Sequence, residues 1–290
     1  MAVHRRKYIV ASVCGFCRGV KRAVALFDEA CGKGSVYVLH ELVHNKSVSN
    51  SMISRGAVFV DKCDEIPDGA TVLIGAHGVS DAVETSLRRR CTVIDATCPR
   101  VKALQSAAAG VSPVQELVML CKPHHPEATG VMGCAVTPYV YPVSSVADIE
   151  KLPELHAPFL LAQTTMSGKL VSEVESCLKK RYPALVSRCR ICDASEKRQK
   201  SAAELAGKCD VVFVAGSAHS SNAVELVNII KSCGVGAYLV DSGEDIRDFM
   251  IENAVTAGIT AGASTPDELI QDVAATLEKY GFSNGDDADD

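Results

Sequence analysis

The chain has 290 residues, of which 47% are hydrophobic, and its formal net charge at pH 7 is −5. This length and apolar content suffice for two ordinary domains or three small lobes, each with a core. No basic stripe interleaves with aromatic residues, and no apolar run reaches the about 18 residues of a membrane span, so neither nucleic-acid binding nor membrane insertion is expected.

Cysteine usage indicates a reducing compartment. The 13 cysteines are odd in number and scattered along the chain, which is unlike a compact disulfide scaffold. The apolar run Tyr8–Val13 follows a basic N-terminus but has only six residues, which is short for a secretion signal and fits a first β-strand. We therefore expect a cytoplasmic protein whose thiols serve packing or metal binding.

Short apolar runs alternate with helix-compatible stretches, the pattern of parallel α/β units. The predicted strands after the first are Val36–Leu39, Val58–Val60, Val72–Ile74, Leu117–Leu120, Tyr139–Tyr141, Phe159–Leu161, Val211–Val214 and Tyr238–Val240. The predicted helices include Val20–Glu29, Val101–Ala109, Leu170–Lys180 and Lys197–Ala206.

A threefold repeat is visible in the spacing. Each of three cysteines opens a predicted helix, and an apolar strand that runs into a polar loop begins 19 residues later. The cysteines are Cys17, Cys98 and Cys192, and the strands begin at Val36, Leu117 and Val211. A second strand and a loop of small residues follow in each copy. Self-similarity at a fixed offset predicts three equivalent structural units.

We expect an α/β fold of three similar α/β lobes in a pseudo-threefold arrangement around a central cavity. The expected lobes are residues 19–98, 99–190 and 191–281, the third joined by the N-terminal strand 1–18, with a disordered acidic tail at 282–290. Ligands of parallel sheets gather at the carboxyl ends of the strands, so lobes that face one another would bring three cysteines and six loops into one cavity.

The three cysteines are candidate metal ligands, because a helix N-terminus favours the thiolate that binds metal. Three thiolates could hold zinc or an iron–sulfur cluster, and a 4Fe-4S cluster with three ligands keeps one iron open for substrate. Two C-x-x-C pairs, Cys14/Cys17 and Cys189/Cys192, offer a structural four-cysteine zinc site instead, although about 170 residues separate them. A thioredoxin-like role for Cys14/Cys17 is a further alternative without other signs of that fold.

The polar loops carry imidazoles, hydroxyls and an amide, a set that suits a compact anion such as a diphosphate. These residues are His44, His77, His125, Thr164, Ser220, Ser221, Asn222 and Ser264. Glu127 follows His125-Pro126 and has two interpretations. It could stabilise a helix start, or it could be a proton donor whose pKa is raised near a cluster and an anionic substrate.

Taken together, these motifs resemble the LytB family of 4-hydroxy-3-methylbut-2-enyl diphosphate reductases, also called IspH, over about residues 8 to 281. The motifs are Gly15-Phe-Cys17-Arg-Gly-Val20, His40-Glu-Leu-Val-His44-Asn45, Ala76-His77-Gly-Val-Ser80, Asp95-Ala-Thr-Cys98-Pro99, His125-Pro-Glu127, Gln163-Thr-Thr165, Ser220-Ser-Asn222 and Thr260-Ala-Gly-Ala-Ser264.

The resemblance implies a 4Fe-4S enzyme that catalyses the last step of the non-mevalonate (MEP/DOXP) isoprenoid pathway. Such an enzyme reductively dehydroxylates 4-hydroxy-3-methylbut-2-enyl diphosphate and yields isopentenyl and dimethylallyl diphosphate. The substrate hydroxyl would bind the open iron, which acts as Lewis acid and electron source. Reduced ferredoxin or flavodoxin would supply the electrons, with neither nucleic acid nor membrane as a partner.

The resemblance also implies roles for individual residues. Cys17, Cys98 and Cys192 would be the cluster ligands. Glu127 would deliver protons, and Thr164 would lie beside the substrate hydroxyl. The diphosphate would be held by His44, His77, His125, Ser220, Ser221, Asn222 and Ser264.

The chain departs from the family pattern at a few positions. Cys14 stands where the family often has Arg, and Glu196 adds a charge four residues after Cys192. These departures bear on efficiency and on the electron partner more than on the type of reaction. Two other functions are compatible with parts of the sequence: a structural zinc protein, and an iron–sulfur sensor that would need the cluster but not Glu127.

Overall fold

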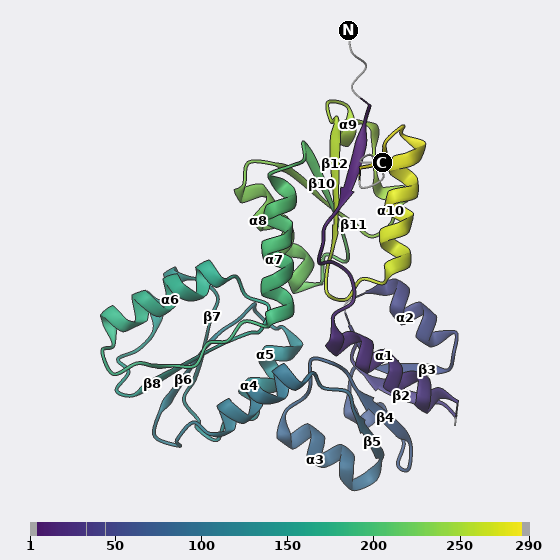
Figure 1. Ribbon diagram of the computed structural model, residues 1–290. Helices are drawn as coiled ribbons and strands as arrows, with labels where there is room; N and C mark the ends of the chain where they lie inside the picture. The colour runs from purple at the N-terminus through teal and green to yellow at the C-terminus, as the bar shows by residue number, and fades with distance from the viewer. Residues whose placement is uncertain (1–4, 33, 44, 286–290) are drawn as a thin grey trace. The chain divides into compact units, whose positions relative to one another are not determined.

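The structure is a computed structural model that describes residues 5–32, 34–43 and 45–285 and arranges them in three parallel sheets (Figure 1). Its residues form two compact units. The described parts of 1–17, 44–46 and 193–290 form one, here called the terminal unit, and those of 18–43 and 47–192 form the other, here called the central unit.

The central unit contains two four-stranded sheets with orders β3-β2-β4-β5 and β7-β6-β8-β9, so equivalent strands take equivalent places. The strands are β2 (Val36–Leu39), β3 (Ala57–Val60), β4 (Thr71–Ile74), β5 (Thr92–Asp95), β6 (Glu116–Leu120), β7 (Val140–Val143), β8 (Pro158–Ala162) and β9 (Val186–Ser187). The helices are α1 (Arg18–Cys31), α3 (Asp81–Arg90), α4 (Pro99–Ala109), α5 (Pro126–Met132) and α6 (Gly168–Arg181), and α2 (Lys46–Ile53) lies mostly in this unit.

The terminal unit contains one five-stranded sheet with the order β11-β10-β12-β1-β13. Its strands are β1 (Lys7–Val10), β10 (Val211–Ala215), β11 (Gly236–Val240), β12 (Thr256–Ala261) and β13 (Ser283–Asn284), and its helices are α7 (Asp193–Ala206), α8 (Ser221–Ser232), α9 (Asp248–Ile251) and α10 (Asp267–Lys279). β1 takes the fourth place, which β5 and β9 take in the other sheets. The shared strand order confirms the predicted repeat.

The core lies on both faces of each sheet, as the alternation of side chains along a strand requires. In β10, Val211 and Phe213 pack into the cluster that includes α10, while Val212 and Val214 pack into the cluster with α7 and α8 (Figure 1). All five side chains of β10 are buried. Such strands therefore read as unbroken apolar runs in the sequence.

The prediction of a disordered tail from residue 282 is wrong for its first residues. Phe282 is 3% exposed and joins the core of the terminal unit, and the Arg6 guanidinium lies 4.1 Å from the centre of its ring. Ser283 and Asn284 pair with β1 as the edge strand β13. The polar composition misleads here because a sheet edge needs only backbone hydrogen bonds from its last strand. Residues 286–290 lie outside the described residues.

The predicted lobe boundaries at residues 98 and 190 stay a prediction, because the first two sheets belong to a single compact unit. Across the part of the chain that the structure describes, no helix is both long and apolar enough to cross a bilayer.

Candidate active site

Each of the three candidate cysteines directly precedes a helix, as predicted: Cys17 precedes α1, Cys98 precedes α4 and Cys192 precedes α7. All three are half-buried free thiols. Each also follows a fourth-place strand, so the repeat places the cysteines at equivalent points of the fold. Unpaired N–H groups and the positive end of the helix dipole favour an anionic ligand at such points.

The backbone of Cys98 is fixed on both sides. Its N–H donates to the carbonyl of Ala76 at 3.0 Å, and its own carbonyl accepts from the N–H of Lys102 at 2.9 Å in the first turn of α4. Pro99 begins that helix, where its fixed φ is favourable and its missing N–H is not needed. The backbone that carries the Cys98 thiol is therefore held in place by these hydrogen bonds.

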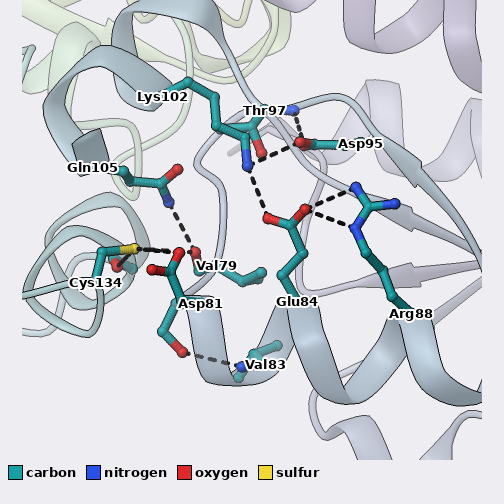
Figure 2. A network of polar contacts seen from close by, with 12 residues as sticks. Val79, Asp81, Val83, Glu84, Arg88, Asp95, Thr97, Lys102, Gln105 and Cys134 are labelled. Carbon is teal, nitrogen blue, oxygen red and sulfur yellow. Dashed lines mark hydrogen bonds and ion pairs between the residues drawn. The ribbon is translucent and has the colours of Figure 1, made fainter. Parts of the chain in front are cut away.

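A polar network supports the loop that leads to Cys98 (Figure 2). One carboxylate oxygen of Asp95 accepts from the N–H of Thr97 at 2.9 Å, and the other lies 2.9 Å from Lys102 Nζ. Lys102 also donates to Glu84 at 2.8 Å, and Glu84 accepts two hydrogen bonds from Arg88. The network ties β5, α3 and α4 together around the cysteine.

Opposite charges in this network reinforce one another. Burial alone would raise the pKa of Glu84 and Asp95, but hydrogen bonds from Lys102 and its neighbours hold the pKa of both carboxyls below its ordinary value. Burial would likewise lower the pKa of Lys102, and the two carboxylates raise it instead. All three side chains are therefore charged at neutral pH.

Thr164 connects the third cysteine of the candidate site with the predicted proton donor. Its carbonyl accepts from the N–H of Cys192 at 2.9 Å. Its own N–H donates to Glu127 Oε1 at 2.7 Å, and its hydroxyl donates to Glu127 Oε2 at 3.0 Å. Both oxygens of the carboxyl thus face the loop after β8, and one residue holds the acid and a candidate ligand together.

Glu127 is 2% exposed, and burial raises its pKa to about 7 despite the hydrogen bonds from Thr164, which lower it. The pKa of Glu127 is thus raised, as predicted, and burial accounts for the rise without a nearby cluster or anionic substrate. The N–H of Glu127 donates to Nδ1 of His125, which caps α5. The helix start is therefore capped by His125, while both carboxyl oxygens of Glu127 are held by Thr164. Its role as a proton donor stays a prediction.

His125, which caps the helix of this acid, contacts a second histidine. The rings of His77 and His125 meet edge to face, with centroids 5.3 Å apart. His125 is 8% exposed and His77 is half-buried. The central unit therefore brings together four predicted site residues, namely His77, His125, Glu127 and Thr164.

Gln163 is a residue whose role the sequence analysis missed. It is fully buried at the end of β8. Its amide oxygen accepts from the N–H of Lys122, and its amide nitrogen donates to the hydroxyl of Thr165 at 2.9 Å. The side chain therefore ties the loop after β6 to the loop after β8. An amide directly after a run of buried apolar residues is the sequence signal that could have revealed it.

The terminal unit carries the hydroxyl and amide part of the predicted site. Ser220 caps α8, and the hydroxyl of Ser264 donates to it at 3.5 Å. Asn222 Oδ1 accepts from the N–H of Ala263 at 2.9 Å. Asn222 Nδ2 is buried and has no hydrogen-bond partner among the described residues, so a donor stands available for an anion. Ser221 is buried in the first turn of the same helix.

Cys17 is tied to this set through one residue, Ala263. Its N–H donates to the carbonyl of Ala263 at 3.0 Å, and the N–H of Ala263 donates to Asn222. The candidate ligand and the candidate anion site of the terminal unit therefore share a backbone support. His44, the remaining predicted substrate residue, lies outside the described residues.

Three free cysteines at helix starts suit an iron–sulfur cluster, whose ligands are thiolates. The alternative zinc site would also use Cys14 and Cys189. Burial raises the pKa of Cys14, and it raises the pKa of Cys189 to about 11, so each is held as a thiol in the metal-free protein. Within the residues that the structure covers, no three His, Cys, Asp or Glu side chains form a group that could hold a metal ion, and Cys17 belongs to a different unit from Cys98 and Cys192.

The model of the LytB protein family matches residues 8–278. Among the relatives, a 4-hydroxy-3-methylbut-2-enyl diphosphate reductase of Proteus mirabilis is 39% identical over 284 residues, which covers 94% of this chain and 90% of the relative. The protein of the same name from Cronobacter sakazakii is 39% identical over 287 residues, with 95% and 90% coverage.

Solved structures agree with this relationship. The E-1-hydroxy-2-methyl-but-2-enyl-4-diphosphate reductase from Plasmodium falciparum has a TM-score of 0.91 at 27% identity and covers 97% of this chain and 91% of its own. A second (E)-4-hydroxy-3-methyl-but-2-enyl diphosphate reductase, described as the terminal enzyme of the non-mevalonate pathway, has a TM-score of 0.67 at 32% identity, with 94% and 99% coverage. The α/β fold class is thereby confirmed, and the chain belongs to the LytB protein family.

Proposed function

We propose that this chain reduces 4-hydroxy-3-methylbut-2-enyl diphosphate to isopentenyl and dimethylallyl diphosphate, the last step of the non-mevalonate isoprenoid pathway. The activity named for its relatives supports this proposal. The observation that carries it is the buried pair of Glu127 and Thr164, in which a carboxyl with a pKa of about 7 is held by a hydroxyl. A reaction that consumes protons near neutral pH needs such an acid.

The proposed cofactor is one 4Fe-4S cluster held by Cys17, Cys98 and Cys192, with one iron open to substrate. When bound, such a cluster supplies electrons and a Lewis-acidic iron. The overall reaction takes up two electrons and two protons and releases the allylic hydroxyl as water. Ferredoxin or flavodoxin is the proposed electron donor. All 13 cysteines are free, which supports a reducing, cytoplasmic location.

Glu127 is the proposed proton donor. About half of its carboxyl groups are protonated at pH 7, given the pKa of about 7. The hydroxyl of Thr164 contacts one carboxyl oxygen, so this hydroxyl can pass a proton between the acid and a leaving hydroxyl of the substrate. Burial excludes water from the acid, which directs its proton toward the substrate.

The proposed diphosphate ligands come from both units. His77 and His125 belong to the central unit. The further proposed ligand His44 lies outside the described residues. Ser220, Ser221, Asn222 and Ser264 belong to the terminal unit. The unpartnered Nδ2 of Asn222 supports this role, because a buried donor without an acceptor costs about 1–3 kcal/mol unless a ligand accepts its hydrogen bond.

Anaerobic purification followed by metal analysis tests the cofactor. The expected result is a brown protein with about four irons and as many sulfides per chain, whose absorbance changes when the diphosphate substrate is added. A colourless protein with one zinc and no sulfide would instead establish the structural zinc alternative.

Two substitutions separate the roles of ligand and acid. We expect Cys98→Ser to lose iron and activity, whereas Glu127→Gln keeps its iron and loses diphosphate reduction by about 10²-fold or more. Activity is measured with dithionite and methyl viologen as reductant. Cys233→Ser is the control, because Cys233 is an exposed cysteine outside the site. An iron-loaded, active Cys98→Ser protein would contradict the ligand assignment, and undiminished reduction by Glu127→Gln would reject Glu127 as the proton donor. An iron-loaded parent protein that does not reduce the diphosphate would favour the sensor alternative.

A further inference from the structure

Arg198 is a buried cation whose location is unexplained by the site described above. It belongs to α7 and is 4% exposed. Burying a guanidinium costs several kcal/mol unless hydrogen bonds compensate. Its Nε and one terminal nitrogen both donate to the carbonyl of Gly15, at 3.2 and 2.6 Å, and its other terminal nitrogen donates to the carbonyl of Ala194 at 2.8 Å. Two of its three nitrogens therefore donate to one carbonyl of the loop that leads to Cys17.

Gly15 is a point where this loop has little freedom. Its φ is +72°, a conformation that favours glycine. A Cβ at this position would lie 3.0 Å from a carboxylate oxygen of Asp267 and 3.2 Å from Ile270. Two residues later, the N–H of Cys17 donates to the carbonyl of Ala263. The peptide groups on both sides of Phe16 are thus anchored, and these anchors determine where the Cys17 sulfur can go.

We propose that Arg198 is a positioning residue for Cys17: its guanidinium fixes the Gly15 carbonyl so that the thiol is presented for cluster binding. The binding of a cluster rests on the proposed function, whereas the fixing of the Gly15 carbonyl by Arg198 concerns the protein alone. The guanidinium, held at a carbonyl two residues before Cys17, would also offset the negative charge of the thiolates. Net charge and hydrogen bonding near the sulfurs set the reduction potential of such clusters.

The loop of Cys98 contains a similar device. Arg22 in α1 donates to the carbonyl of Asp95 at 3.1 Å and to the carbonyl of Thr97 at 3.3 Å. Arg22 comes five residues after Cys17, and Arg198 comes six residues after Cys192. In two of the three repeats, the helix opened by one candidate ligand therefore carries an arginine that holds the loop of another. The equivalent positions of α4 are Ala103 and Leu104 and carry no cation.

The test compares Arg198→Met, which removes charge and hydrogen bonds, with Arg198→Lys, which keeps the charge but not the paired geometry. Lys200→Met is the matched control, because Lys200 lies on the same helix with 80% of its side chain exposed. In the iron-free proteins, hydrogen–deuterium exchange is measured for the peptide that contains residues 14–18. We expect faster exchange in both Arg198 variants and no change in the control.

The anaerobically reconstituted proteins supply the second measurement. Both Arg198 variants should lose iron to a chelator, with cluster affinity about tenfold or more below that of the parent, and only Arg198→Met should lower the midpoint potential. Unchanged exchange in both variants would overturn the proposal whether or not the protein binds a cluster. If exchange is faster in the Arg198 variants but the parent protein binds no iron, the positioning role is kept and the proposed cofactor is rejected. Should Arg198→Met not fold, Arg198→Lys decides alone.

Discussion

Glu127 owes its chemistry to its surroundings more than to its own carboxyl group. Burial raises its pKa from 4.5 to about 7, because water no longer solvates the ionised form. Glu127 and Thr164 were both predicted as site residues, but their hydrogen bonds could not be foreseen. The two residues lie 37 apart in sequence, and they meet only because β6 and β8 are neighbours in one sheet.

The raised pKa makes stability depend on pH. A carboxyl whose folded-state pKa lies above its unfolded value stabilises the fold below the unfolded pKa, and this contribution is lost as pH rises through the folded pKa. For Glu127 the loss falls between about pH 4.5 and 7. We therefore expect Glu127→Gln to gain about 2 kcal/mol of unfolding free energy relative to the parent between pH 5 and pH 8. Denaturant unfolding at both pH values measures the difference, and a gain that is independent of pH would show that Glu127 ionises normally.

A single substitution tests whether Arg22 holds the loop that leads to Cys98. Arg22→Gln removes the charge and weakens the hydrogen bonds to the carbonyls of Asp95 and Thr97. We expect the peptide containing Cys98 to exchange its amide hydrogens faster, while global stability changes by less than about 1 kcal/mol, because Arg22 is an exposed residue. Arg55→Gln, on the same unit but outside this loop, is the control. Equal exchange in the two variants would show that Arg22 leaves the loop unaffected.

The elements of the central unit are joined by charge as well as by apolar packing. Lys102 in α4 lies between Glu84 in α3 and Asp95 at the end of β5 (Figure 2). A helix and a strand end are therefore fixed relative to the helix that begins beside Cys98. Such networks stabilise a fold more than isolated surface ion pairs do, because one ordered side chain interacts with two partners.

Lys102→Met should leave two carboxylates close together without their cation. We expect a loss of about 1 kcal/mol of stability and faster removal of iron by a chelator. The matched control is Lys151→Met, whose side chain is 76% exposed and pairs with Asp148; it should change stability by less than about 0.5 kcal/mol. Thermal unfolding and a chelator time course are the measurements. If the two variants behave alike, the network has no particular role at Cys98.

Elements differed in how well the sequence predicted them. β2, β6 and β10 were predicted to within one residue at each end, because strands covered on both faces read as continuous apolar runs. β5 was missed because none of its side chains is fully buried, and β9 was missed because it has two residues. β12 was also missed, although five of its six residues are buried, because its sequence contains only one large apolar residue, Ile259. A strand was therefore visible in the sequence where large apolar residues follow one another.

The molecule as a whole repeats one plan three times, and the ends of the chain complete the third copy. The fixed offset between each cysteine and the next strand predicted this plan because each copy spans the same number of residues from cysteine to strand, although α4 has 11 residues and α1 and α7 have 14. The convergence of the three thiols remains a prediction, since Cys17 lies in the terminal unit and the other two lie in the central unit. No local pattern can specify a distance between residues so far apart in the chain.

The completion of the third copy depends on Phe282. Phe282→Ala should destabilise the protein by about 3–5 kcal/mol, because the ring is 3% exposed in the core beneath β1 and β12. Phe249→Ala is the control in the same unit, since Phe249 is 65% exposed. Chemical denaturation followed by circular dichroism compares them. Similar losses in both variants would mean that the tail contributes no more than a surface residue.

The place of β1 between β12 and β13 has a consequence for biosynthesis. Residues 7–10 are translated well before their partners at 256–259 and 283–284. The nascent chain must therefore carry an unpaired apolar segment until those partners emerge from the ribosome. The terminal sheet can close only after residue 284 has emerged, whereas the two central sheets have all their strands by residue 187 and can form co-translationally.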